Sequence, residues 1–180
     1  MDNGADNYCR FLAGDECAFD EIMKDFFDCL IFFINRYLLD IHASEDIAID
    51  VFSDLIVHRR RYNFKVSLKT YLFMLARCRA LNYIKRQKRC LTVALEQAET
   101  WTDEKEWLEE KILVNEQKRR VYAALAVLPH SMRTAVHLVY FENLSYDECA
   151  CVMRKNRKQV DNLLYRAKNE LRTILGKELL

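Results

Sequence analysis

The sequence is poor in the residues that interrupt helices, because its 180 residues include one proline and three glycines. No region alternates apolar and polar residues with the two-residue period of a β-strand. Hydrophobic residues make up 51% of the chain, which is enough to bury a sizeable core. These properties predict an all-α protein made of one domain or two small ones.

The sequence also lacks a long apolar run. Residues 30–34 form its most apolar segment, which is far shorter than the roughly 20 residues that span a bilayer. The first residues are acidic and carry no apolar stretch of the kind found in a signal peptide. We therefore expect a cytoplasmic protein that does not insert into a membrane.

Patterns typical of catalysis and of metal binding are missing as well. The seven cysteines include no CxxC pair, and the two nearest, Cys149 and Cys151, would point to different sides of a helix. Reduced thiols packed as small hydrophobes are the preferred interpretation. The four histidines are scattered, no carboxylates cluster as metal ligands, and there is no glycine-rich phosphate loop. We expect no enzyme activity, no catalytic residue, no metal and no cofactor.

Acidic residues are absent from residues 59–90, which carry eleven lysines and arginines. Residues 1–57 have the opposite balance, with thirteen acidic and three basic residues. Residues 91–116 are acidic again, and residues 117–180 are basic, by twelve to six. The net charge of +1 therefore hides two basic blocks, which indicate two nucleic-acid surfaces on one chain.

The segment 144–171 has the features of two short helices joined by a tight turn. Ser145 and Glu148 have the spacing of a capping box at the start of the first helix. Asn156 and Gln159 have the same spacing at the start of the second helix. The two helices are therefore expected to begin at these residues.

The same segment has the pattern of a helix-turn-helix, with the small Ala150 followed ten residues later by the β-branched Val160. In that motif the second helix lies in the major groove of DNA. An ordinary helical hairpin with a solvated basic face is the alternative, and we favour DNA binding over it. The turn and the start of the second helix carry four basic residues: Arg154, Lys155, Arg157 and Lys158.

Three amphipathic helices are predicted in the N-terminal half, at residues 15–39, 44–59 and 68–89. Ser44 and Ser67 are the expected N-caps of the second and third helices. The second helix also carries an acidic ridge with a four-residue spacing, formed by Asp46, Asp50 and Asp54. This ridge is either a solvated face or a docking site for a basic partner.

Four aromatic residues lie among the lysines and arginines of the acid-free segment: Tyr62, Phe64, Tyr71 and Tyr83. Aromatic rings next to lysine and arginine are typical of a surface that stacks unpaired bases. The alternative is that these rings belong to the core and that the charges only provide solubility. We favour contact with nucleic acid.

Residues 91–115 have no clear helical period and are the predicted linker between two domains, residues 1–90 and 116–180. Further helices are expected at residues 103–128 and 133–141, with Pro129 between them. The predicted fold is thus two small helical domains, of which the second contains the helix-turn-helix.

Both domains carry motifs in an order that is typical of one family. The C-terminal motifs are Leu128-Pro129, Glu142-Asn143-Leu144-Ser145-Tyr146-Asp147-Glu148-Cys149-Ala150 and Val160 with Leu164-Tyr165-Arg166-Ala167. The N-terminal motifs are Glu45-Asp46-Ile47 with Asp50-Val51-Phe52, and Tyr71-Leu72 with Leu75-Ala76-Arg77 and Asn82-Tyr83-Ile84-Lys85-Arg86. With these motifs the chain resembles the bacterial RNA polymerase sigma factors of the compact extracytoplasmic-function (ECF) type, in the sigma-70 family. The resemblance covers roughly residues 15–175.

The resemblance implies a transcription initiation factor that binds core RNA polymerase, melts the −10 element of a promoter and reads the −35 element. Contacts with polymerase would come from Asp46, Asp50, Phe52 and Leu55. The single-stranded −10 element would be held by Tyr62, Phe64, Lys69, Tyr71, Arg77, Asn82, Lys85 and Arg86. The −35 duplex would be read by Arg157, Lys158, Gln159, Asn162, Tyr165 and Arg166. Many relatives are controlled by an anti-sigma factor, which makes such a protein a candidate partner.

Some positions depart from the family pattern. Tyr71 stands in place of the usual tryptophan, and Cys78 in place of an asparagine that reads a −10 base. Asp161 stands where many members have a basic residue. These differences affect the choice of promoter. A stand-alone helix-turn-helix regulator is the alternative function, but such a protein has no need for an acidic ridge followed by an acid-free aromatic helix.

Overall fold

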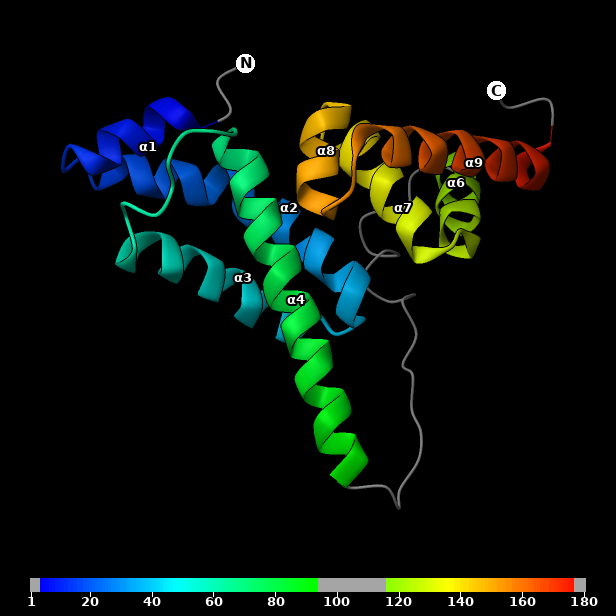
Figure 1. Cartoon of the computed structure of the whole chain (residues 1–180), viewed down its shortest axis with the longest axis horizontal. Coiled ribbons are helices and arrows are strands. Elements are labelled where there is room, and N and C mark those ends of the chain that lie inside the picture. The colour runs from blue at the N-terminus through cyan, green and yellow to red at the C-terminus, as the bar shows by residue number, and fades with distance from the viewer. Residues whose placement is uncertain (1–3, 94–115, 177–180) are drawn as a thin grey trace. The chain divides into compact units, whose positions relative to one another are not determined.

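The computed structural model of the chain describes residues 4–93 and 116–176, in which every regular element is a helix (Figure 1). Contacts between residues divide the chain into two units, Met1–Trp101 and Thr102–Leu180. The predicted class, an all-α fold of two helical units, is confirmed. Residues 94–115, which make up most of the predicted linker, and the predicted helix start at residue 103 lie outside the described residues.

The described part of the first unit contains α1 (Ala5–Leu12), α2 (Cys17–Leu38), α3 (Ile41–Val57) and α4 (Leu68–Val93). Helix α2 packs against the other three, and α3 also packs against α4. Their apolar faces meet in a core where Ile22, Leu30 and Leu72 are fully buried. Helix α4 extends three residues into the predicted linker.

Helix α1 was not predicted from the sequence. It has eight residues, and its two buried side chains, Tyr8 and Phe11, are too few to establish a helical period. It packs along α2, so its stability comes from tertiary contacts, as expected for a helix of this length.

The predicted N-cap of α3 is wrong. Asp40 caps this helix, because its Oδ1 accepts a hydrogen bond from the Ala43 N–H at 3.1 Å. Ser44 lies inside the helix and is fully buried, and its hydroxyl donates to the Asp40 carbonyl at 2.6 Å. The predicted cap of α4 agrees with the structure, since the Ser67 hydroxyl accepts from the Thr70 N–H at 3.2 Å.

The described part of the second unit contains α6 (Glu116–Val127), α7 (His130–Val136), the π-helix η1 (His137–Phe141), α8 (Tyr146–Met153) and α9 (Arg157–Leu175). Helix α9 packs against α6, α7 and α8, and so forms the spine of this unit. Pro129 separates α6 from α7, as expected for a residue that has no backbone N–H to donate.

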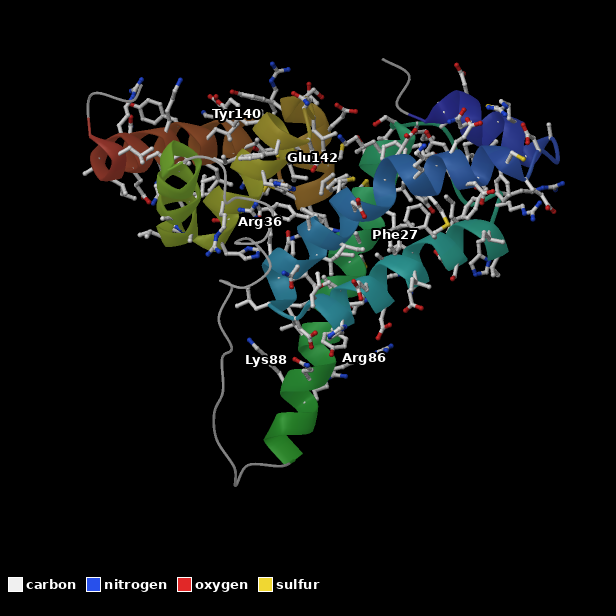
Figure 2. The ribbon with its side chains drawn as sticks, turned by 180° about the vertical axis from the view of Figure 1, so that it is seen from behind. Phe27, Arg36, Arg86, Lys88, Tyr140 and Glu142 are labelled. Carbon is white, nitrogen blue, oxygen red and sulfur yellow. The ribbon has the colours of Figure 1, made fainter. Side chains whose placement is uncertain are left out.

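The helix predicted at residues 133–141 begins earlier and changes type. It starts as α7 at His130 and continues as η1, where the Glu142 N–H donates to the His137 carbonyl five residues back at 3.1 Å. The wider turn leaves both side chains buried, with His137 Nε2 and Glu142 Oε1 3.3 Å apart; Glu142 is labelled in Figure 2. Apolar periodicity does not distinguish this turn from an α-turn.

Candidate nucleic-acid interface

Two capping boxes fix the starts of α8 and α9. The Ser145 hydroxyl accepts from the Glu148 N–H at 3.2 Å, and Glu148 Oε2 accepts from the Ser145 N–H at 3.0 Å. Asn156 Oδ1 accepts from the Gln159 N–H at 2.8 Å, and Gln159 Oε1 accepts from the Asn156 N–H at 3.0 Å. Both predicted boxes are confirmed, because each depends only on residues three positions apart.

The turn between α8 and α9 passes through Arg154, whose φ of 53° is left-handed. In this conformation the Lys155 N–H donates to the Ala150 carbonyl at 2.9 Å and closes the end of α8. Cys149 of α8 and Val160 of α9 are fully buried, so the two helices have apolar inner faces. The two helices and the turn therefore form a helix-turn-helix with α9 in the position of the recognition helix.

All the side chains predicted to read the −35 element are exposed: Arg157, Lys158, Gln159, Asn162, Tyr165 and Arg166. Two of them already have partners within the unit. Arg157 Nη1 forms an ion pair with Asp147 Oδ2 at 2.9 Å, and the Gln159 oxygen belongs to the capping box. Asn162 and Arg166 lie one helical turn apart on α9 and share a face.

The predicted acidic ridge is present on α3, with exposed Asp46 and Asp50. Asp54 is mostly buried and is bound by two arginines, Arg61 at 3.2 Å and Arg79 at 3.4 Å. Arg79 also lies 3.5 Å from Asp50. The Asp54 end of the ridge thus packs against arginines of the same unit, whereas Asp46 at the other end is accessible to a partner.

Phe52 and Leu55, which were predicted to contact polymerase, are each 2% exposed and belong to the core. A buried side chain has no surface to offer a partner, so the structure argues against direct contact by these two residues. The exposed apolar side chains on α3 are Ile49, Ile56 and Val57. The sequence analysis did not consider these three residues as contacts; the position of Ile49 three residues after Asp46, on the side of the acidic ridge, was the available signal.

The predicted base-stacking aromatics separate into a buried and an exposed group. Tyr62 is 4% exposed, and its hydroxyl donates to the Val66 carbonyl at 2.7 Å. Phe64 is 46% exposed and has a left-handed φ of 60°, with its ring centroid 4.6 Å from that of Tyr62. The Tyr71 ring lies 5.1 Å from Tyr62 and is partly buried, and burial raises the pKa of both tyrosines. Phe64 is the ring that this segment presents to solvent.

The remaining predicted −10 residues follow along α4. Lys69 and Arg77 are partly buried, whereas Asn82, Lys85 and Arg86 are exposed. Figure 2 labels Arg86, together with Lys88, on the end of α4 that extends beyond α2 and α3. Where α3 meets the basic segment, residues 56–61 line an open cleft of about 590 Å³.

Within residues 4–93 and 116–176, no group of histidine, cysteine, aspartate and glutamate side chains is arranged to hold a metal ion. In the same ranges, no helix combines the length and the apolar character needed to cross a membrane.

Each unit thus presents a basic surface, α4 with no acidic residue in the first unit and the exposed face of α9 in the helix-turn-helix of the second. Two family matches make the assignment specific: Sigma-70 region 2 matches residues 8–90, and Sigma-70, region 4 matches residues 118–171. Together these matches cover well over half of the chain, which belongs to the sigma-70 family of RNA polymerase sigma factors.

The predicted function, a transcription initiation factor that binds core RNA polymerase and promoter DNA, is thereby confirmed. The region 2 match disfavours the stand-alone regulator. Sigma factors as a family are initiation factors without enzymatic activity.

Two sigma factors match this chain over most of their length. The ECF RNA polymerase sigma factor SigM of Bacillus subtilis is 22% identical over 158 residues, which are 88% of this chain and 95% of SigM. The RNA polymerase sigma-H factor of Pseudomonas aeruginosa is 27% identical over 172 residues, which are 90% of this chain and 88% of that protein.

Solved structures share the fold. The sigma factor RpoE of Bartonella quintana, solved with the anti-sigma factor NepR, has a TM-score of 0.66 at 17% identity and covers 87% of this chain and 96% of its own. CnrH, solved with the cytosolic domain of CnrY, has a TM-score of 0.66 at 17% identity, and the match covers 98% of this chain and 99% of CnrH.

Proposed function

We propose that the two units divide the recognition of a promoter between them. Residues 1–90 would dock on core RNA polymerase and open the −10 element, residues 116–180 would read the −35 element, and residues 91–115 would link them. The charge pattern of the first unit carries this proposal. Exposed aspartates lie on α3, whereas α4 has many bases and no acidic residue.

The proposed polymerase contact is the open edge of α3. Asp46 and Asp50 supply negative charge, and Ile49, which is 50% exposed, lies between them and supplies apolar area. Mixed apolar and charged surface of this kind gives an interface both affinity and orientation. Phe52 and Leu55 support the contact from beneath by fixing α3 in the core.

The proposed −10 contact combines the Phe64 ring with the lysine and arginine side chains of α4. An exposed aromatic ring stacks on an unpaired base whatever its identity, and Tyr62 and Tyr71 pack behind this one. The open cleft lined by residues 56–61 directly precedes Tyr62 in the same loop and would leave space for an extruded base beside it. Lys69, Arg77, Lys85 and Arg86 would hold phosphates, and Asn82 would face the strand.

The proposed −35 contact is the exposed face of α9. Asn162 and Arg166 are suited to base edges in the major groove, because an amide and a guanidinium can each form two hydrogen bonds with a purine. Arg157 and Lys158, in the first turn, would hold phosphates, and Tyr165, about two turns further along α9, would add a contact with DNA. Gln159 uses its oxygen in the capping box and keeps its amide nitrogen for DNA.

Two further features belong to this proposal. An anti-sigma factor is the proposed regulatory partner, supported by the complex of RpoE with the anti-sigma factor NepR. The protein would act in the cytoplasm, where core polymerase is found, and would itself catalyse no reaction.

Transcription with core polymerase and a randomised promoter library tests the proposal. Asn162→Ala is expected to change the −35 preference by about 1–3 kcal/mol of discrimination and to leave polymerase binding intact. Asp50→Ala is expected to weaken polymerase binding and to leave −35 duplex binding intact. Asp20→Ala, which removes an exposed aspartate from α2, is the matched control. Equal loss of both activities in either variant would contradict the division of labour.

A further inference from the structure

The short helix α1 contacts the loop between α3 and α4, residues 58–66, which we call the 58–66 loop. Tyr8 of α1 is fully buried, and its hydroxyl donates to the Arg59 carbonyl at 2.6 Å. The Arg59 guanidinium carbon lies 4.5 Å from the centroid of the Phe11 ring, one helical turn further along α1. The start of the loop is therefore held by α1 at both its backbone and its side chain.

The Tyr8 ring also supports the middle of the loop. Its centroid lies 5.2 Å from that of Tyr62, with the rings edge to face, and 6.1 Å from that of Phe64. Phe64 has a φ of 60°, a conformation that is unfavourable for a residue with a large side chain. Such a conformation persists only where neighbouring contacts enforce it, and Tyr8 and Tyr62 are its ring contacts.

The beginning of α1 is fixed to the rest of the unit by Gly4. This residue has a φ of 79°, and a Cβ placed on it would lie 2.8 Å from the Phe26 ring and 3.1 Å from the Leu68 side chain. Phe26 belongs to α2, and Leu68 is the first residue of α4. Helix α1 thus connects the two long helices to the loop that precedes α4.

We propose that Tyr8 is a positioning residue for promoter opening, because it holds the 58–66 loop in the conformation that presents Phe64 to an unpaired base. The inference rests on the proposed function of that loop. Tyr8 itself touches no DNA in this arrangement, since it is fully buried. The N-terminal helix would accordingly determine the efficiency of −10 opening without altering polymerase binding or −35 recognition.

Tyr8→Phe tests the proposal because it removes one hydroxyl and keeps the ring. In the free protein, we expect trypsin to cleave after Arg59, Arg60 or Arg61 about fivefold faster, the factor expected when one backbone-directed hydrogen bond is lost. With core polymerase, opening of a −10 element that carries 2-aminopurine should fall by about the same factor. Polymerase affinity and −35 duplex affinity should match those of the wild type.

Tyr37→Phe is the control for loss of a tyrosine hydroxyl elsewhere in the unit, at the end of α2, and should leave both readouts at the wild-type value. If Tyr8→Phe has wild-type cleavage and opening, or if it lowers −35 and polymerase affinity by the same factor, the inference is wrong. If the wild-type protein itself opens no promoter, the proposed function fails, and the cleavage assay on the free protein still decides whether Tyr8 holds the loop.

Discussion

The two units hold their proposed DNA contacts in place by interactions of different range. In the second unit, the start of α9 is set by Asn156 and Gln159, which are three residues apart, and the turn before it by Lys155 and Ala150. In the first unit, the 58–66 loop is set by a hydrogen bond between Tyr8 and Arg59, which are 51 residues apart. One surface is built mainly from neighbours in the chain, and the other from helices that are distant in the chain.

This difference predicts how each surface responds to change. Local caps and turn bonds form wherever their few residues are present, so the geometry at the start of α9 should tolerate substitutions elsewhere. The 58–66 loop depends on α1, which in turn depends on α2 and the first turn of α4. Substitutions far from this loop should therefore change its conformation.

The largest loss of stability is expected for Gly4→Ala. This substitution disturbs the contact of α1 with α2 and α4, on which the 58–66 loop depends. The left-handed φ costs alanine about 1–2 kcal/mol, and the contact with Phe26 and Leu68 adds about 1–3 kcal/mol. Gly14→Ala is the matched control, because Gly14 has a φ of 101° and no atom within 4 Å of its Cβ position. Urea unfolding should show the greater loss of stability for Gly4→Ala; equal losses would mean that the contact is unimportant.

Phe64→Ala should have the next largest effect, and this effect should be confined to the affinity for DNA. Loss of one stacked aromatic ring weakens binding of a single strand by about 1–3 kcal/mol. Affinity of the holoenzyme for a −10 single-stranded probe is the measurement, with Phe64→Tyr as the variant that keeps the ring. If the alanine variant binds the probe as well as the tyrosine variant, Phe64 does not stack on a base.

Asn156→Ala should have a smaller and purely local effect. Removal of the cap at the start of α9 is expected to destabilise the second unit by about 1 kcal/mol, as measured by thermal unfolding. Asn156→Ser, which keeps a capping oxygen, should recover most of that loss. A change in trypsin cleavage of the 58–66 loop in either variant would break the distinction between the units.

The smallest effect at neutral pH concerns two buried groups, one in each unit. Burial, aided by Tyr71, raises the pKa of Tyr8 from 10.0 to about 12, and burial raises the pKa of the Cys149 thiol from 9.0 to about 12. Between the two pKa values the folded protein keeps a proton that the unfolded chain releases. The contribution of each group to the free energy of unfolding is therefore complete below its unfolded pKa and is lost as the pH rises towards 12. Urea midpoints measured from pH 8 upward should fall less steeply in Tyr8→Phe than in the wild type above about pH 10.

The range of the contacts also explains what could be predicted from the sequence. The capping boxes of α8 and α9 and the cap at Ser67 depend on short spacings, and all three were predicted. The burial of Tyr62 depends on which helices cover it, and periodicity alone does not supply that information. Tyr8 was missed as a support for the loop because its partner, Arg59, lies beyond any local pattern.

The ion pair between Arg157 and Asp147 has a consequence for the thermodynamics of −35 binding. Both side chains are largely exposed, and their nitrogen and oxygen are 2.9 Å apart, so the protein supplies its own counterion to this arginine. When DNA binds, a phosphate would replace Asp147 at Arg157 and release its cation, and the freed Asp147 carboxylate would attract a cation in turn. Because the salt dependence of DNA binding counts released ions, its slope should be shallower, by about one phosphate contact, than the basic residues of α9 would suggest.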